Sequence, residues 1–291
     1  MSETISAALV KELRERTNAP LMDCKKALQK AKGNIEEAVK EMRKAGKTKA
    51  DNKAGRQAAE GQIFILVNDD KSAAAILELN CETDFCAKDS NFIEFGNAVI
   101  ARALAAGIAD VNELSTLALK SNNDETVEQA RQALVAKIGE NVQIRRVVLV
   151  SAKGELAIYS HGGRIGVIID GNSSHLHDLA MHIAATNPQV VKQADVPQHM
   201  IDNERTIFVA QAEQSGKPAD IVEKMVEGRI KKYLDEVSLL GQPFVKDSSV
   251  TVAQLLNANK EEIFQFVRFE VGEGIQKVQT NFAEEVMAQV R

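Results

Sequence analysis

The sequence predicts an α+β protein with four pieces: a small N-terminal three-helix domain (1–55), two related α+β core subdomains with antiparallel sheets (56–142 and 143–271), and a C-terminal helical module (272–291). Two observations predict this fold class. Apolar residues recur at helical spacing in the first fifty residues, and the succession of strand hairpin, polar turn and apolar helix then occurs twice. With 291 residues, 44% hydrophobic and 26% charged, the chain is large enough for about two domains with buried cores.

Three short helices are expected in the N-terminal piece. Leu9, Val10 and Leu13 fall on one face of the first helix, TNAP breaks it, and Gly33 suits the end of the second. Asn34 is expected to cap the third helix. The segment GKTKADNKAGRQAAEG that follows is polar, basic and weakly periodic, and we interpret it as a linker. The helices are expected at about 5–16, 21–31 and 35–45.

The first core subdomain begins with a strand hairpin. GQIFILV and SAAAILELNC are short runs of strand-forming residues separated by the turn signal NDDK. The polar segment TDFCAKD follows, and then the helical pattern NFIEFGNAVIARALA. A second helical pair is expected over about 111–137.

The second core subdomain begins with the same succession. VQIRRVVLVS, ELAIYSH and RIGVIID are expected strands joined by AKGE and GG, and SSHLHDLAMHIAAT is an expected helix capped by Ser174. An inserted helical hairpin is expected at about 196–237, with the breaker SGKP between its helices. Such a hairpin would protrude as an antiparallel coiled coil or pair with a second copy to form a homodimer. Its thin apolar stripes contain Ile201, Phe208, Ile221 and Met225.

The end of the chain is expected to return to the core and then to leave it. QFVRFEV is interpreted as the last strand of the second subdomain. GEG at 272–274 then turns into the helical run IQKVQTNFAEEVMAQV, which is expected to clasp another molecule.

Charge and composition limit the classes of partner. Lys and Arg number 36 against 41 Asp and Glu, so the net charge is −5, which argues against nucleic acid as a direct ligand. Three cysteines form no disulfide framework and suit a reducing cytosol. The first residues lack the pattern of a signal peptide, and the apolar run 98–109 is too short for a bilayer and contains Arg102. We therefore expect a soluble cytoplasmic protein with no membrane contact.

The sequence contains no complete phosphate-binding motif. GKT at 46–48 has the ending of a P-loop, but Glu41 stands at the first glycine position. HGGRIG at 161–166 lies between two expected strands, where a hairpin turn explains it. The strand, GEG and helix succession resembles an anion-binding helix N-terminus, yet Lys277 stands where a dinucleotide motif has its third glycine. These signals do not support a nucleotide-dependent enzyme.

Metal and catalytic patterns are equally weak. His175 and His177 diverge by about 200° on a helix, and we interpret these two and His182 as solvated or core-edge histidines. Cys81 and Cys86 lack the second ligand pair that zinc spacing requires, and Cys81 suits a buried strand position. We expect no catalytic residue, no metal and no cofactor, which favours a binding protein.

The segment TDFCAKD at 83–89 is the strongest candidate site. Asp84 and Phe85 stand at the turn between a strand that ends at Cys81 and the next helix. A phenylalanine on a polar loop either packs back onto the core, as most do, or is offered to a partner. Beside a carboxylate, an exposed ring would form a wedge that fills an apolar slot while the acid changes polar or metal contacts nearby.

Seven segments along the whole chain resemble elongation factor Ts of bacteria, in the order and spacing of that family. Seven collinear segments are far more specific than any single motif. The predicted layout also fits the family, with a ubiquitin-associated-like N-terminal domain. The segments are RERTNAPLMDCKKAL (14–28), LNCETDFCAKD (79–89), LVAKIGENVQIRR (134–146), HGGRIGV (161–167), VEKMVEGR (222–229), EVSLLGQPFV (236–245) and RFEVGEGI (268–275).

The resemblance implies guanine-nucleotide exchange on elongation factor Tu, the GTPase that delivers aminoacyl-tRNA to the ribosome. The partner would be bound in its GDP-bound and nucleotide-free states. Asp84 and Phe85, flanked by Thr83 and Cys86, would enter between helices of the GTPase domain, displace the magnesium region and loosen GDP so that GTP can rebind. Further partner contacts implied by matching position, besides the C-terminal helix, are Arg14, Leu21, Met22, Lys25, Ile138, Gly139 and His161.

Departures from the family pattern concern affinity rather than function. Cys86 stands where the family commonly has valine, Asn18 where it has glycine, and Leu21 where it has methionine. Two other hypotheses stay open. A scaffold using a ubiquitin-associated-like domain explains residues 1–55 but leaves TDFCAKD without a role. A nucleotide-dependent enzyme built on HGGRIG or GEG requires that the chain itself bind GDP or NAD.

Overall fold

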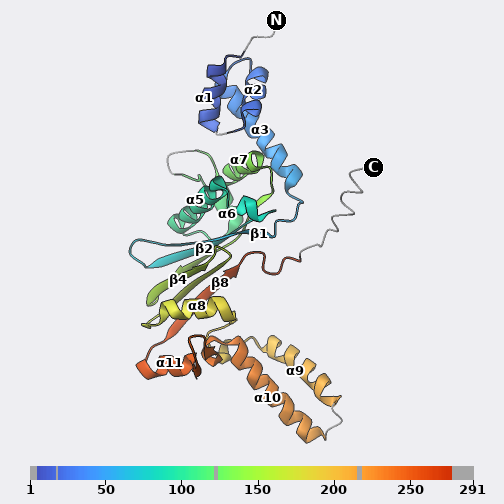
Figure 1. The fold of residues 1–291 in the computed structure, drawn as a ribbon, viewed down its shortest axis with the longest axis vertical. Coiled ribbons are helices and arrows are strands. Elements are labelled where there is room, and N and C mark those ends of the chain that lie inside the picture. Colours follow the sequence, from blue (N-terminus) through green and yellow to red (C-terminus); the bar gives the residue numbers. More distant parts are fainter. Residues whose placement is uncertain (1–4, 18, 121–123, 215–217, 277–291) are drawn as a thin grey trace. The chain divides into compact units, whose positions relative to one another are not determined.

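The chain folds into two compact units with helices and strands in both (Figure 1). The predicted α+β class is confirmed. Within the described part of the chain, no helix combines the length and the apolar character that a bilayer crossing requires. The computed structural model describes residues 5–17, 19–120, 124–214 and 218–276. The first unit contains the described residues of 1–64, 77–148 and 270–291, and the second those of 65–76 and 149–269.

Three helices form the N-terminal bundle, as predicted. Leu13, Cys24 and Leu28 are fully buried in its small core. The Asn34 side chain caps the third helix by accepting a hydrogen bond of 3.1 Å from the N–H of Glu37. The helices are α1 (Ala7–Thr17), α2 (Leu21–Lys30) and α3 (Ile35–Lys53).

The segment interpreted as a linker after the third helix is helical over its first half, so that interpretation is wrong there. α3 continues through it to Lys53 and packs against α7 (Val127–Ile138), with Gly46 and Ala50 buried. A Cβ at Gly46 would lie 3.8 Å from the backbone oxygen of Gln132, so the two helices approach closely. Small residues carry little hydrophobic signal, which is why periodicity did not predict the extension.

The first sheet has the order β1-β2-β3 and is built on the predicted hairpin. β3, which the sequence pattern grouped with the strands that follow it, pairs with β2 instead. The rings of Phe64 in β1 and Phe92 in α5 lie 6.4 Å apart, and a Cβ at Gly96 would meet the Phe64 ring at 2.2 Å. The elements are β1 (Glu60–Val67), β2 (Ala73–Cys81), β3 (Val142–Ser151), α5 (Ser90–Ala106) and α6 (Val111–Thr116).

The second sheet has the order β4-β5-β8, and α8 packs against β4 and β5. β4 and β5 are antiparallel, with His161 opposite Ile165. Gly162 and Gly163 between them have φ values of +57° and +70°, so HGGRIG is a hairpin turn, as predicted. The elements are β4 (Glu155–His161), β5 (Ile165–Gly171), α8 (Leu176–Thr186) and β8 (Ile263–Glu270).

Ser174 does not cap α8, contrary to the sequence prediction. The N-cap position is His175. The N–H and the hydroxyl of Ser174 instead donate to the carboxylate of Glu261, at 3.0 and 2.8 Å. A carboxylate 87 positions away thus competes successfully for the capping hydroxyl.

Three elements between α10 and β8 were not predicted: β6 (Pro243–Phe244), β7 (Asp247–Thr251) and α11 (Val252–Asn259).

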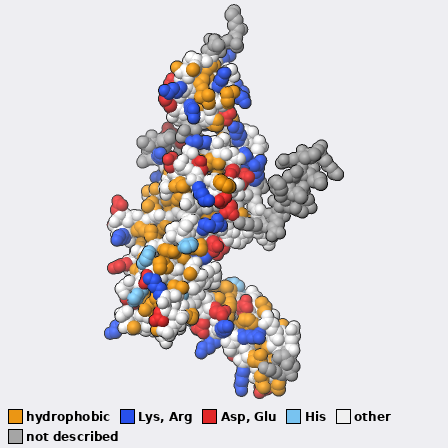
Figure 2. All heavy atoms as spheres, viewed as in Figure 1, with side chains coloured by type: hydrophobic (Ala, Val, Ile, Leu, Met, Phe, Trp, Pro, Cys, Tyr) orange, Lys and Arg blue, Asp and Glu red, His pale blue; other side chains and the backbone are white. Residues whose placement is uncertain are grey.

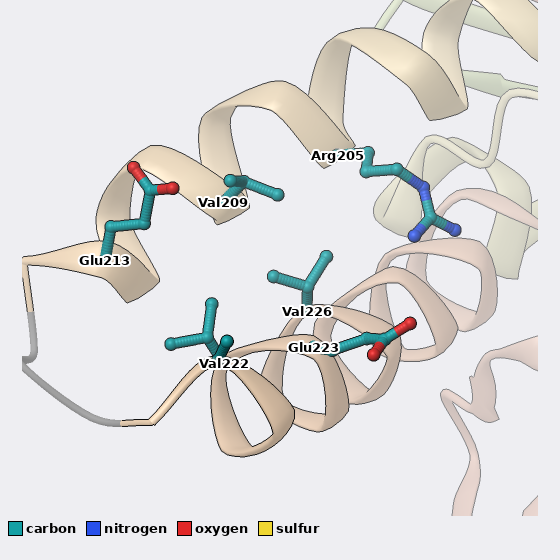
Figure 3. Close-up of a pocket in the computed structure, with 7 residues that line it drawn as sticks. Arg205, Val209, Glu213, Val222, Glu223 and Val226 are labelled. Atoms are coloured by element: carbon teal, nitrogen blue, oxygen red, sulfur yellow. The ribbon is translucent and has the colours of Figure 1, made fainter.

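α9 (Gln198–Glu213) and α10 (Ala219–Val237) form the predicted helical hairpin. Between them lies a pocket of about 360 Å³ in which Val209 faces Val222 and Val226, with charged side chains at its edge (Figure 3). Ile221, assigned to an apolar stripe by its spacing, is exposed instead. Pairing of the hairpin with a second copy stays a prediction.

A buried carboxylate joins distant parts of the first unit. Glu78 in β2 accepts hydrogen bonds from Arg145 and Arg146 of β3, at 2.9 and 2.7 Å, and from the N–H of Gly272, at 2.8 Å. Burial alone would raise the pKa of Glu78, but these donors outweigh it and hold the pKa below its ordinary value. The charged carboxylate therefore fastens residue 272 to a strand 194 positions earlier.

Gly272 is suited to this contact because its surroundings exclude a side chain. Its φ is +75°, and a Cβ would lie 2.5 Å from the backbone oxygen of Ala59. The GEG turn does bind an anion, and that anion is the Glu78 carboxylate of the same chain. The C-terminal helix predicted after this turn lies outside the described residues.

Glu78→Ala should destabilise the first unit strongly. The substitution removes the carboxylate that binds both Arg145 and Arg146, although Arg146 keeps its ion pair with Glu273. Breaking a buried ion pair costs about 3–5 kcal/mol. Because both arginines keep some solvent contact, we expect a loss near the lower end of that range, measured by urea denaturation. Glu37→Gln, which breaks an exposed pair with Lys40, is the matched control and should leave the unfolding midpoint unchanged. A midpoint as high in Glu78→Ala as in the wild type would contradict this account.

Acidification should destabilise the second unit through His182, which is fully buried rather than at the core edge. Its Nδ1 accepts the N–H of Val245 at 3.2 Å and its Nε2 lies 2.9 Å from Gln242, so the ring is neutral. Burial lowers the pKa of His182 below 6.5. The unfolded chain then takes up the proton first, and stability is lost as pH falls through about 6.5. Denaturation at several pH values should show a flatter profile for His182→Gln, and equal slopes would refute this assignment.

Candidate functional site

The segment TDFCAKD folds into a one-turn helix with defined ends. α4 (Asp84–Ala87) begins after Thr83, whose side chain accepts a hydrogen bond of 3.2 Å from the N–H of Cys86. A capping threonine satisfies one of the free N–H groups of a first helical turn. Asp89 then caps the next helix, α5, by accepting the N–H of Asn91 at 2.8 Å.

Glu140 fixes the base of this turn. Its two carboxylate oxygens accept hydrogen bonds from the N–H and the hydroxyl of Thr83, at 2.9 and 2.7 Å. The next residue, Asn141, donates its N–H to Glu82 at 2.6 Å. Two neighbouring positions of one segment thus bind two neighbouring positions of the other. Hydrogen bonds to a charged acceptor are the stronger kind, so the turn is held firmly.

Phe85 is offered to solvent rather than packed on the core. It is 81% exposed, whereas Cys86 beside it is 3% exposed. Successive residues of a helix differ in direction by about 100°, so burial of Cys86 turns Phe85 outward. The inward packing that is usual for a loop phenylalanine does not occur here.

Asp84 presents an ionised carboxylate beside this ring. The Nζ of Lys88 lies 2.8 Å from its Oδ2. This hydrogen bond lowers the pKa of Asp84 below its ordinary value. Both side chains are exposed, and exposed ion pairs contribute little to stability. The carboxylate can therefore exchange Lys88 for a contact on another molecule at small cost.

Two buried thiols lie beneath the turn. Cys81 ends β2, as the sequence predicts for a buried strand position, and its Sγ donates to the backbone oxygen of Thr83 at 3.1 Å. The neighbouring Cys81, then burial and the charge of Glu140, raise the pKa of the Cys86 thiol. That thiol is therefore protonated and a poor nucleophile.

The corner at Ile138 and Gly139 adjoins the turn through Glu140. Gly139 ends α7 with a φ of +88°, and Ile138 is half-buried. The backbone oxygen of Gly139 accepts a hydrogen bond from the side chain of Lys53 at the end of α3. The structure therefore brings this corner and the turn together.

The candidate residues of the N-terminal bundle form an exposed face. Arg14, Leu21, Met22 and Lys25 are all exposed. Leu21 and Met22 are 51% and 58% exposed, because the opposite side of α2 fills the bundle core. Figure 2 shows hydrophobic side chains on the surface of these helices among lysine and arginine side chains. Exposed apolar residues ringed by charge are typical of a protein-binding face.

His161 belongs to the second unit, so the structure does not group it with the turn. It is exposed at the end of β4, and its Nδ1 lies 3.1 Å from the hydroxyl of Tyr159. The Tyr159 ring also contacts the ring of His177, with centroids 6.0 Å apart. His161 is therefore oriented by a neighbour on its own strand.

Two contributors to the site were not predicted from the sequence. Lys88 could have been found, because it follows Asp84 by four residues, the spacing of a helical ion pair. Glu140 carries no such signal, because it lies 57 residues from Thr83 and directly after a helix-ending glycine. Its role depends on tertiary contact alone.

The site as a whole has the chemistry of a binding surface. It offers an apolar ring and a carboxylate on a turn whose base is fixed by hydrogen bonds. A fixed turn loses little conformational freedom on docking, which favours affinity.

Comparison with known proteins identifies relatives over nearly the whole chain. The family model described as Elongation factor TS matches residues 82–273. The chain is 54% identical to "Elongation factor Ts" of Legionella pneumophila (strain Paris) over 291 residues, which cover 99% of both chains. It is 53% identical over 293 residues to the protein of that name from Thioalkalivibrio sulfidiphilus, covering 99% of both. For Coxiella burnetii (strain CbuK_Q154) the identity is 50% over 291 residues, covering 99% of this chain and 98% of the relative.

Thr83→Val should loosen the turn without unfolding the protein. Valine keeps the shape but removes the hydroxyl that caps α4 and donates to Glu140. Loss of a cap costs about 1 kcal/mol, and loss of the charged hydrogen bond adds to it. The amides of residues 86 and 87, which donate to the hydroxyl and the backbone oxygen of Thr83, should then exchange with deuterium about 10-fold faster or more. Thr126→Val, which removes the equivalent cap of α7, is the control and should leave these amides protected. Unchanged exchange in Thr83→Val would mean that Thr83 does not hold the turn.

Proposed function

Because the chain belongs to the elongation factor Ts family, whose members are nucleotide exchange factors for elongation factor Tu in translation elongation, we propose that the turn at 83–86 is the part that acts on this GTPase. In this proposal Asp84 and Phe85 enter the GTPase domain, while Thr83 and Cys86 fix their position. Arg14, Leu21, Met22, Lys25, Ile138, Gly139 and His161 provide the remaining docking contacts.

The observation that carries the proposal is the exposure of Phe85 on a fixed turn. Phe85 is 81% exposed, so its side chain contributes no burial energy to folding and is removed from water only when a partner covers it. Buried aromatic anchors dominate the binding energy of many interfaces. The turn holds this anchor ready, because Glu140 and the Thr83 cap fix its base before any partner arrives.

Exchange requires only a difference in affinity between two states of the GTPase. A factor that binds the nucleotide-free form more tightly than the GDP form must weaken GDP binding by the same factor. Phe85 would supply apolar contact energy in the nucleotide-free complex. Neither Asp84 nor Phe85 needs to make or break a covalent bond. A small amount of the factor changes the rate of exchange but not the final balance of GDP and GTP.

Asp84 would act on the magnesium region of the partner. Magnesium bridges phosphate oxygens to protein groups, so its displacement lowers nucleotide affinity. The Asp84 carboxylate is ionised and exposed, and its ion pair with Lys88 is weak enough to be exchanged. A charged group of this kind can compete for the polar contacts around the metal.

The geometry gives the other two hypotheses less support. HGGRIG forms a hairpin turn between β4 and β5, and the Gly272 N–H of the GEG turn is bound to Glu78. Both motifs therefore have structural roles that account for their glycines. A scaffold that used the N-terminal bundle alone would leave the exposed ring of Phe85 without a function.

Stopped-flow release of a fluorescent GDP from elongation factor Tu tests the proposal. The full chain should accelerate release strongly. Phe85→Ala should lose about 2 kcal/mol of binding energy, which lowers the acceleration at subsaturating factor about 30-fold. Asp84→Asn, which keeps the shape of the side chain, should lose a smaller part.

The controls separate the wedge from general surface effects. Val245→Ala removes an exposed apolar side chain of the second unit and should leave release unchanged. Phe85→Leu keeps part of the apolar volume and should fall between the wild type and Phe85→Ala. Full acceleration by both Phe85→Ala and Asp84→Asn, with wild-type circular dichroism, would place the active part elsewhere in the chain.

A further inference from the structure

We propose that Cys81, Cys86 and Glu140 form a binding site for one thiophilic divalent cation of the zinc class, located beneath the turn at 83–87. The site goes beyond the proposed exchange function and does not depend on it. Its three ligands come from three elements: the end of β2, α4, and the segment after α7.

The positions of the ligand atoms suit a small tetrahedral ion. The two sulfurs and one carboxylate oxygen all lie within 4.8 Å of one another. A tetrahedral zinc ion with Zn–S bonds of about 2.3 Å holds its sulfurs about 3.8 Å apart. Inward movements of an ångström or less would therefore bring the three atoms to bonding distance.

The ligand chemistry selects the class of cation. Thiolate sulfur favours zinc, cadmium and other soft or borderline ions, whereas magnesium and calcium prefer oxygen ligands. Three protein ligands leave a fourth tetrahedral position for water. Binding converts both thiols to thiolates and releases two protons, so that the dication and three anionic ligands leave a net charge of −1 on the bound site.

The groups around the ligands already hold them in place. The N–H and hydroxyl of Thr83 bind the two oxygens of Glu140, and a carboxylate has further lone pairs available for a cation. Donors of this kind orient metal-binding carboxylates in proteins. Both cysteines are buried, but Glu140 is only half-buried and Gly139 next to it is exposed. Of the three ligands, the Glu140 carboxylate is therefore the one in contact with solvent.

A disulfide is the other chemistry open to two neighbouring thiols, and the structure favours it less. Disulfide formation requires attack by a thiolate and a two-electron oxidant, and both thiols are buried beside the Glu140 carboxylate. A cation does not meet this obstacle, because its own charge stabilises the thiolates.

Titration of the full-length, reduced protein with Cd²⁺ tests the site. Cadmium gives a thiolate charge-transfer band in the ultraviolet at a longer wavelength than the corresponding zinc band. We expect the band to saturate at one cation per chain, to be abolished by competing Zn²⁺ and to be unaffected by excess Mg²⁺. Cys86→Val, which keeps a small apolar side chain in the buried position, should lower the affinity at least 10-fold.

A control variant and a second measurement distinguish binding at this site from binding to another thiol of the chain. Cys24→Ala removes the third thiol, which is buried in the N-terminal bundle, and should leave the band unchanged. Zn²⁺ should raise the thermal unfolding midpoint of the wild type and of Cys24→Ala, but not that of Cys86→Val. A band of wild-type affinity in Cys86→Val, or no saturable band in the wild type, would overturn the proposal. No partner protein enters either measurement, so failure here is distinguishable from failure of the exchange function.

Discussion

The hydrogen-bonded carboxylate of Glu78 is the contact on which the first unit depends. It lies in a strand that is buried along almost its whole length, and it binds two arginines of the next strand and the backbone of Gly272. A buried charge is unfavourable unless every acceptor position finds a donor. Chain segments far apart in sequence must therefore meet at this one group. Glu78 lies in the same strand as Cys81, so this contact also helps to position the strand that leads into the turn at 83–87.

In the candidate site, nearer the surface, a second carboxylate also joins two distant segments by accepting hydrogen bonds. Glu140 binds the N–H and hydroxyl of Thr83, and this contact fixes a turn of only four residues that could not be stable alone. The thiols of Cys81 and Cys86 fill the space beneath it. The ring of Phe85 then has no inward position to occupy. Exposure of the ring is thus a consequence of the buried thiols below the turn, and Asp84 is exposed on the same turn.

The sequence predicted those elements whose signal is local. Short runs of strand-forming residues and turn signals located β1, β2, β4 and β5 closely, and helical spacing located α1, α2, α5 and both helices of the hairpin. The prediction failed where tertiary contact decides. α3 extends because Gly46 lies against α7, and Ser174 binds Glu261 instead of capping its helix. In the site, the motif containing Asp84 and Phe85 was recognisable, but its support by Glu140 was not.

Because Thr83 caps α4, the number of residues between Thr83 and Phe85 is constrained more tightly than the identity of those residues. Phe85 lies two residues after Thr83, and each residue of a helix advances the side-chain direction by about 100°. One residue inserted between them would rotate the aromatic ring toward the direction now taken by Cys86, into the protein interior. Substitutions at these positions alter the strength of a contact, but an insertion or deletion changes which residue faces outward. The motif can therefore diverge in sequence much more readily than in spacing.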